Sequence, residues 1–345
     1  RKMGASSSQP EWTCKDIPDL TGFRILVTGG DAGIGKVVAE NFIQFSNCEK
    51  VILACRSEER AKVAIADIIA TTPVFPGAAP TAERLELLIL DLGDLDQVRV
   101  AAEDLKKRFS RIDICINNAG LCTATPFAPA RNPKPLGDEH KTKQGHEMCM
   151  GVNHFGHFLF NSKIFPLLLA SKAVTKKPAR IVSVASEAHK TSAGIECDDI
   201  NWETRMYQGW QAYCDSKLAN VQYMFSLGKR LKERGLDGDV TIVSLHPGFG
   251  SSELWRDLSW RHRMMIAAIT ETPRNLSRNE VRAAVDEGLA TGTYTNPSKG
   301  FAGVEHSYGP PVIGEVTAVA KDPEQCEKLW QKTEQLVGEP FFPKP

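Results

Sequence analysis

The chain has 345 residues, enough for one large domain or two ordinary ones with a sizeable core. Its 42 basic and 42 acidic residues balance to a formal net charge of zero, and no long basic run occurs, which argues against a nucleic-acid surface or a polybasic membrane patch. The longest apolar stretches are well short of the roughly 20 residues that cross a bilayer. We therefore expect a small-molecule partner, no nucleic acid and no transmembrane segment; peripheral membrane contact stays open.

Nine cysteines without Cys-x-x-Cys spacing predict reduced thiols in a reducing compartment, and neither a disulfide framework nor a zinc site. That compartment is expected to be cytoplasmic or organellar, with the chloroplast, the mitochondrion and the cytosolic face of the endoplasmic reticulum as alternatives. They stay open because the sequence begins with Arg1, so an anchor or transit peptide could have been removed. Residues 1–19 are polar and are expected to form a flexible lead-in.

From residue 20 onward, short runs rich in Val, Ile and Leu alternate with helical patterns at a spacing of 3.6 residues. Strands this uniformly apolar are typical of a parallel sheet covered by helices on both faces. We predict one doubly wound α/β domain over residues 20–345. The expected strands are 24–27, 51–54, 85–90, 112–116, 180–184 and 240–245, and the expected helices are 36–45, 58–69, 95–109, 151–169, 210–234 and 323–337.

Three segments interrupt this rhythm. The Pro-rich stretches 71–81 and 123–145 are predicted to be surface insertions, because neither can continue a helix or strand. Residues 251–303 follow the sixth strand and are predicted to form a substrate lid at the carboxyl edge of the sheet. The tryptophans and apolar helix in that region are as consistent with core or oligomer contacts as with a lid, and residues 291–294 fit either a turn or a short last strand. The apolar residues concerned are Trp255, Trp260 and Met264.

A glycine-rich loop connects the first strand to the first helix. Gly29, Gly33 and Gly35 let backbone N–H groups approach a pyrophosphate, and the following helix presents its positive end to it. The alternative is a glycine-rich turn without a ligand. Asp31 lies inside the loop, and an acid there is expected to weaken cofactor affinity.

The end of the second strand bears on which dinucleotide binds. A carboxylate at this position binds a ribose 2′-hydroxyl, whereas an arginine suits a 2′-phosphate. The chain has Arg56 here and no acid, so NADPH/NADP⁺ is expected over NADH/NAD⁺, with Arg56 as the phosphate clamp. The alternative is a surface arginine paired with Glu58 or Glu59.

Tyr213 and Lys217 are four residues apart on a predicted helix, which places them on one face. A neighbouring ammonium favours phenolate, so Lys217 is expected to lower the pKa of Tyr213. Without the glycine loop, two residues on a solvated helix face would be the better interpretation. Together the two motifs predict a proton donor beside a cofactor.

In chain order these motifs resemble those of the short-chain dehydrogenases/reductases over about residues 20–255, and the resemblance implies a Rossmann-type fold. Other segments resemble the branch of the retinol dehydrogenases and the WW-domain oxidoreductases. The family motifs are Thr28-Gly-x-x-x-Gly-Ile-Gly35, Asp91-Leu92, Asn117-Asn118-Ala119-Gly120, Asn153, Ser186, Tyr213-x-x-x-Lys217 and Pro247-Gly248; the branch segments are 53–56, 152–158, 216–220 and 245–248.

The resemblance implies that Tyr213 exchanges a proton with the substrate oxygen while Ser186 hydrogen-bonds that oxygen. Lys217 would hold the nicotinamide ribose and Asn153 a relay water. Simpler roles stay open: Ser186 as a helix cap, Asn153 as a structural residue and Asp91 as a turn residue. The cofactor-binding residues it implies are Gly29, Asp31, Gly33, Ile34, Gly35, Arg56, Asp91, Leu92, Asn117, Ala119, Gly120, Tyr213, Lys217, Pro247, Gly248 and Ser252, with Asn117 steadying the sheet.

His154, His157 and His189 lack further ligands at metal-binding spacing, so we expect packing histidines and no metal. Cys214 is expected to pack on its helix, with a reactive thiol as the alternative. The hypothesis is thus an NADP(H)-dependent oxidoreductase interconverting a lipophilic carbonyl, retinal-like or another apolar aldehyde or ketone, and its alcohol. The alternative is an NADPH-binding scaffold or redox-sensor subunit of a larger assembly. A homodimer is compatible with either.

Overall fold

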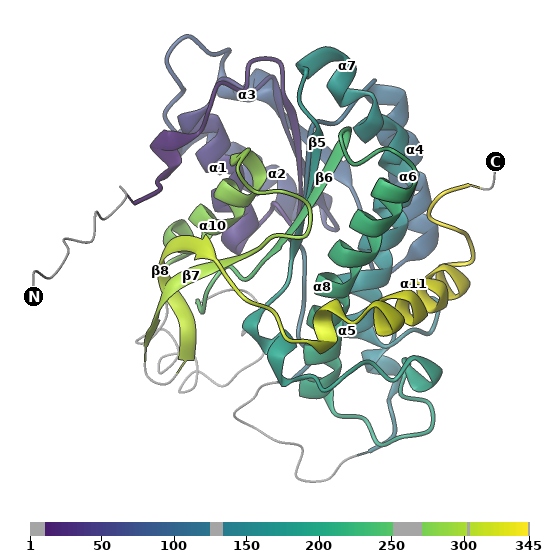
Figure 1. Cartoon of the computed structure of the whole chain (residues 1–345). Helices are drawn as coiled ribbons and strands as arrows, with labels where there is room; N and C mark the ends of the chain where they lie inside the picture. Colours follow the sequence, from purple (N-terminus) through teal and green to yellow (C-terminus); the bar gives the residue numbers. More distant parts are fainter. Residues whose placement is uncertain (1–10, 125–133, 251–270, 302–303, 344–345) are drawn as a thin grey trace, which may run out of the picture.

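The computed structural model describes residues 11–124, 134–250, 271–301 and 304–343. Within them, eight strands form one sheet in the order β3-β2-β1-β4-β5-β6-β7-β8 (Figure 1). The first seven are parallel, and β8 is antiparallel to β7. The strands are β1 (Arg24–Thr28), β2 (Lys50–Cys55), β3 (Leu85–Ile89), β4 (Ile114–Asn117), β5 (Ala179–Val184), β6 (Val240–Leu245), β7 (Tyr294–Phe301) and β8 (Val304–Ile313).

The strand order reverses beside β1. From β1 the chain builds outward through β2 and β3, and then returns to place β4 on the other side, so that Ile25 of β1 pairs with both Val51 and Ile114. The loops after β1 and β4 therefore diverge at the carboxyl edge of the sheet. Open α/β sheets bind their ligands at this kind of crevice.

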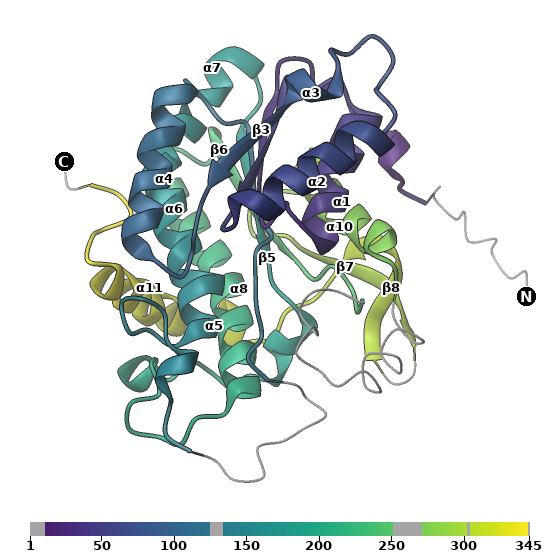
Figure 2. The same ribbon diagram turned by 180° about the vertical axis from the view of Figure 1, so that it is seen from behind.

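Helices cover both faces of the sheet (Figures 1 and 2). On β1, Leu26 belongs to the core under α4, α6, α8 and α11, whereas Ile25 and Val27 belong to the core under α1, α2 and α10. This alternation is what a strand buried on both faces requires. The helices are α1 (Gly33–Phe45), α2 (Glu58–Thr71), α3 (Thr81–Arg84), α4 (Leu95–Arg108), α5 (Met148–Met150), α6 (Gly156–Leu169), α7 (Ser171–Thr175), α8 (Gly209–Glu233), α10 (Pro273–Val285) and α11 (Pro323–Val337).

The predicted α/β architecture is confirmed, and two parts of it were missed. The first is the hairpin of β7 and β8, which contains prolines and glycines that are atypical of an interior strand. Pro311 lies in the edge strand β8, and Pro297 lies beyond Tyr294 and Thr295, the residues of β7 that pair with β6. The second missed element is helix α10. It begins with Pro273, directly after the cap residue Thr272, whose side chain accepts a hydrogen bond from Asn275 N. Tyr294 opens β7, so the turn lies just before it.

The three irregular segments are described in part. Residues 72–80 join α2 to α3 without a helix or strand, and a short 3₁₀ turn, Asp138–His140, lies in the second predicted insertion. In the expected lid region, residues 273–285 form α10, which packs along α1 on the sheet. Ser252, Trp255, Trp260 and Met264 lie outside the described residues.

All nine cysteines lie in the described residues and are free. Among the helices of the described ranges, none has the length and apolar character needed to cross a membrane.

Candidate active site

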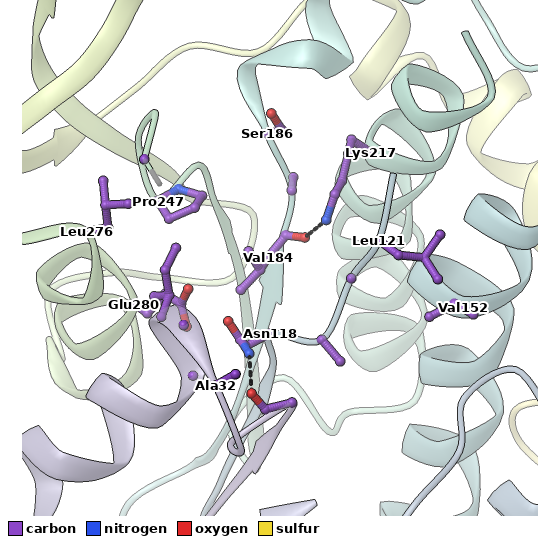
Figure 3. Close-up of a pocket in the computed structure, with 18 of the residues that line it drawn as sticks. Ala32, Asn118, Leu121, Val152, Val184, Ser186, Lys217, Pro247, Leu276 and Glu280 are labelled. Carbon is purple, nitrogen blue, oxygen red and sulfur yellow. Dashed lines mark hydrogen bonds between the residues drawn. The ribbon is translucent and has the colours of Figure 1, made fainter. Parts of the chain in front are cut away.

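A cavity of about 690 Å³ opens at the carboxyl edge of the sheet, bordered by the loops that follow each of the strands β1 to β6 and by α8 and α10 (Figure 3). Most of the residues expected from the sequence line it. They are Gly29, Asp31, Gly33, Ile34, Gly35, Arg56, Asp91, Leu92, Ala119, Gly120, Ser186, Tyr213, Lys217, Pro247 and Gly248.

The glycine loop folds as its sequence predicts. Gly29 and Gly33 adopt positive φ angles of 67° and 55°, the left-handed region that favours glycine. A Cβ at Gly35 would lie 2.5 Å from the carbonyl oxygen of Gly29, so this position has no room for a side chain. Helix α1 begins at Gly33 without a side-chain cap. Its first N–H groups are therefore available to an anion.

Asn118, rather than Asn117, ties this loop to β4. Its Nδ2 donates to Thr28 O at 2.7 Å, and Ala119 N donates to Thr28 Oγ1 at 2.9 Å. Asn117 ends β4 on the same face as Cys115, whose Sγ lies 3.6 Å from Asn117 Oδ1, and it is buried away from the cavity. Asn118 thus holds the glycine loop, and the role of Asn117 in steadying the sheet stays a prediction.

Two arginines, Arg56 and Arg60, line the cavity near the glycine loop. Arg60 pairs with Asp31 at 3.0 Å, so the charge of the acid in the loop is compensated by a neighbouring cation. Arg56 is exposed, and among the described residues it forms no ion pair with either nearby glutamate. Glu58 pairs instead with Lys62, and Glu59 bonds Ser57. Both arginines line the cavity.

Tyr213, Ser186 and Lys217 converge on the cavity. Tyr213 and Ser186 both line it, and Lys217 Nζ lies 5.7 Å from the centroid of the Tyr213 ring. The predicted shared face of α8 is thus confirmed. Lys217 Nζ also donates to Val184 O at 3.0 Å, which holds the ammonium against the end of β5 (Figure 3).

The expected lowering of the Tyr213 pKa is wrong for this structure. Burial raises the pKa of Tyr213 well above its ordinary value, and the neighbouring Ser186 side chain opposes that effect. Lys217 bonds a carbonyl and faces the ring rather than the hydroxyl, so it does not offset the desolvation. Burial also lowers the pKa of Lys217 to about 8.

Asn153 lies in a π-helical turn, Gly151–Phe155, between α5 and α6. Its Oδ1 accepts from Leu121 N at 2.9 Å, and its Nδ2 donates to Leu121 O at 3.0 Å and to Ser216 Oγ at 2.9 Å. The side chain therefore connects the loop after β4 to α8, which is a structural role. Its carbonyl oxygen is hydrogen-bonded to His157 Nδ1 at 3.0 Å.

Ser186 and Asp91 each combine a local structural hydrogen bond with a place at the cavity. Ser186 Oγ accepts from Ala188 N at 3.2 Å and caps a 3₁₀ turn, as expected of a helix cap. Asp91 Oδ1 accepts from Gly93 N at 2.9 Å in the turn after β3, as expected of a turn residue.

His154, His157 and Cys214 behave as buried packing residues. His154 Nε2 is hydrogen-bonded to Thr333 Oγ1, and His157 Nε2 to Thr28 Oγ1. Burial lowers their pKa values to about 3 and about 4, so both rings are neutral. Burial raises the pKa of the Cys214 thiol to about 12, which makes it unreactive.

Four residues at the cavity were missed by sequence reasoning. Trp210 stacks on Tyr213 with ring centroids 5.4 Å apart, and its position three residues earlier on the helix was a usable signal. Glu187 follows Ser186 and is hydrogen-bonded by Tyr294 of β7. His246 lies within the branch segment 245–248 but was not assigned to the site, and Glu280 gave no local signal because it comes to the cavity from α10.

The comparisons with known proteins agree with this geometry. Residues 24–197 match the family model described as short chain dehydrogenase. The human protein named Retinol dehydrogenase 13 is 31% identical, over 94% of this chain and 87% of its own length. Human Retinol dehydrogenase 11 is 30% identical, over 99% and 92%.

Solved structures share the fold. A putative uncharacterized protein from Mycobacterium paratuberculosis matches with a TM-score of 0.70 and 26% identity, over 97% of this chain and 100% of its own. The Pseudomonas aeruginosa RhlG/NADP active-site complex matches with a TM-score of 0.59 and 22% identity, over 80% and 94%. The chain belongs to the short-chain dehydrogenase family, in its retinol dehydrogenase-like branch, and is an oxidoreductase of CH–OH groups.

Proposed function

We propose that the protein interconverts a lipophilic carbonyl compound and its alcohol with NADP(H). The observation that carries this proposal is the convergence of Tyr213, Ser186 and Lys217 on a cavity that also contains the glycine loop and the uncapped N-terminus of α1. A bound nicotinamide supplies the hydride. Tyr213 donates the proton to the carbonyl oxygen, or accepts it from the alcohol, and Ser186 hydrogen-bonds the same oxygen.

Lys217 and Asn153 support this step. Lys217 is held by Val184 O on one side of the tyrosine ring, from where its ammonium reaches the nicotinamide ribose in our assignment. Asn153 keeps the loop with Leu121 against α8 and so fixes the position of the lysine. In this proposal Asn153 also holds the relay water.

The preference for NADPH is supported by the charges around the loop after β2. Arg56 lines the cavity with its guanidinium unpaired among the described residues, and a guanidinium fits a phosphate bidentately. Arg60 lies beside it and neutralises Asp31. We assign the adenine side to Asp91, with the other cofactor contacts as expected from the motifs, including Leu92, Ala119, Gly120, Pro247, Gly248 and Ser252.

The substrate class is proposed from the wall near Tyr213 and from the relatives. Trp210, Leu121 and Phe249 line the cavity and give it apolar surface, and Trp210 stacks on Tyr213. The relatives are named retinol dehydrogenases. We therefore propose a retinal-like or other apolar aldehyde or ketone, in a reducing compartment that suits nine free cysteines.

The cofactor preference is tested by titrating the protein with NADPH and NADH, using the fluorescence of the bound nicotinamide. Charge-assisted hydrogen bonds contribute about 1.5–3 kcal/mol, so Arg56→Ala should weaken NADPH by roughly 10- to 150-fold and leave NADH unchanged. Lys62→Ala is the control, because Lys62 lies on α2, the helix that follows Arg56, and pairs with Glu58 outside the cavity. Equal loss of both cofactors, or no loss of either, contradicts the clamp.

A further inference from the structure

Glu280 is a buried acid without a partner on the wall of the cavity. It is 0% exposed, and neither of its carboxyl oxygens has a hydrogen-bond partner among the described residues. It lies one helical turn after Leu276 on α10, and both residues line the cavity. Figure 3 shows its side chain between Pro247 and Ala32, the residue that precedes α1.

The backbone around Glu280 is fixed on both sides. Asn41 Nδ2 of α1 donates to Ser277 Oγ at 2.8 Å, and Asn279 Nδ2 donates to His246 O at 2.5 Å. Helix α10 therefore cannot rotate Glu280 toward solvent without breaking these contacts. An unsatisfied buried polar group is costly, and an apolar residue would serve packing alone. The position therefore indicates a ligand that completes the hydrogen bonding.

The charges around α10 define the state of the carboxyl. Burial raises the pKa of Glu280 to about 8, and the positive charge of Lys217 on α8 opposes this rise. The group is thus a neutral acid at pH 7, with one O–H to donate. Burial holds His246 of β6 neutral by lowering its pKa to about 3. The other ionisable groups on the elements packed against α10 have partners other than Glu280. Lys36 and Arg274 pair with acids, Lys36 with Glu40 and Asp67 and Arg274 with Glu40. The remaining partners are Ala283 O and Leu289 O for Arg180, Thr13 for Asp16, Glu187 for Tyr294 and Pro297 O for His306.

The neighbouring groups identify what the acid faces. The uncapped N-terminus of α1 and the glycine loop lie on the adjoining wall, and both favour a phosphate. An ionised carboxylate would repel a phosphate there, whereas a protonated one can donate to it. We propose that Glu280 is a cofactor-binding residue that acts as a carboxylic acid, donating its O–H to a pyrophosphate oxygen of the bound dinucleotide.

This proposal rests on the proposed function, namely that the cavity binds a nicotinamide dinucleotide, and it predicts a proton-dependent affinity. The proton on Glu280 is part of the binding site, so binding is full below the pKa of the free protein's carboxyl and falls as pH rises through it. The limiting slope is about tenfold per pH unit for loss of one required proton. Glu280→Gln keeps an N–H donor at every pH and should remove this slope.

The test measures NADPH dissociation constants by fluorescence between pH 7 and pH 10 for the whole chain, Glu280→Gln and Glu280→Ala. Lys217 also titrates in this range, so the readout is the difference between wild type and Glu280→Gln. We expect wild type to weaken at least tenfold more than Glu280→Gln over this range. Glu280→Ala should bind several-fold more weakly than Glu280→Gln at pH 7, because it has no donor.

A second readout follows the proton directly. Calorimetric titration of NADPH at pH 9 in two buffers of different ionisation enthalpy should show proton uptake by wild type and less uptake by Glu280→Gln. Glu233→Gln is the control, since Glu233 is half-exposed and pairs with Lys229 at the far end of α8; it should match wild type.

The outcomes separate the two proposals. An unchanged pH slope in Glu280→Gln, or tighter binding of wild type as pH rises, overturns the assignment of Glu280 as a donor while leaving the cofactor site in place. Absence of NADPH binding at every pH in wild type overturns the proposed function and this assignment with it. Because Glu280→Gln preserves shape, the comparison stands even if Glu280→Ala fails to fold.

Discussion

Gly35 offers a sharp test of the glycine loop as the cofactor's binding surface. In Gly35→Ala, the new Cβ would lie 2.4 Å from Asn118 Nδ2 and 2.5 Å from Gly29 O. The first neighbour is held by its hydrogen bond to Thr28 O at 2.7 Å, and the second is backbone. Neither can yield without moving the loop, so the substitution must displace the surface that faces the phosphates.

The magnitude follows from that displacement. Overpacking in a tight site costs about 1–3 kcal/mol. If the free loop relieves this strain by moving but the cofactor-bound loop cannot, the cost appears as a loss of NADPH affinity of roughly 5- to 150-fold. Gly33→Ala should be milder, because no atom lies within 4 Å of its Cβ position and only the strain of φ +55° remains.

The assay is fluorescence titration with NADPH, with unfolding by urea as a check on stability. Gly238→Ala is the control, since the nearest atom to its Cβ position is Lys172 Nζ at 3.4 Å, the end of a flexible side chain. We expect wild-type affinity in this control and the order Gly35→Ala weaker than Gly33→Ala. If Gly35→Ala binds NADPH as tightly as Gly238→Ala, the loop does not hold the phosphates.

Two further predictions concern stability. Asp94 caps α4 and bonds Lys143; although burial acts to raise its pKa, the hydrogen bonds from Lys143 and other groups lower it to about 2. The ionised carboxylate stabilises the fold above the ordinary carboxyl pKa, and this stabilisation is lost as pH falls toward 2. Asp94→Ala should therefore lower the free energy of unfolding in urea by about 1 kcal/mol at pH 6, and by progressively less below pH 4. An equal loss at pH 6 and at low pH would contradict this. Trp330→Ala should lower the free energy of unfolding by about 3–5 kcal/mol in the same assay. The buried Trp330 ring has its centroid 4.9 Å from that of Phe158, and the Arg230 guanidinium lies over it. A loss below about 1 kcal/mol would show that α11 does not stabilise the domain.

The apolar runs were sufficient to predict β1 to β6, the first six of the parallel strands. Most of these runs are buried on both faces, so their composition alone distinguishes them from an amphipathic strand. The β7–β8 hairpin was missed for the opposite reason, because its prolines are compatible with a strand only once the pairing is known: Pro311 lies in the edge strand, and Pro297 lies beyond the residues of β7 that pair with β6.

The site shows the same division between local and distant causes. Tyr213 and Lys217 share a helix face, which spacing alone predicts. The choice between Asn117 and Asn118 depends on which face of β4 each occupies, and the pKa of Tyr213 depends on burial by distant segments. Glu280 comes to the cavity from α10, more than 60 residues after Tyr213, so no local pattern marked it.

The central claim is that this cavity transfers hydride with Tyr213 as the proton donor. The most direct measurement is NADPH oxidation by wild type and Tyr213→Phe with retinal, aromatic aldehydes, steroids and quinones. We predict turnover of at least one apolar carbonyl by wild type, and a loss of about 10²- to 10⁴-fold in Tyr213→Phe with NADPH affinity nearly unchanged. Full activity of Tyr213→Phe would contradict the mechanism. Tight NADPH binding by wild type without turnover of any compound would contradict the enzymatic proposal and favour a cofactor-binding scaffold or sensor.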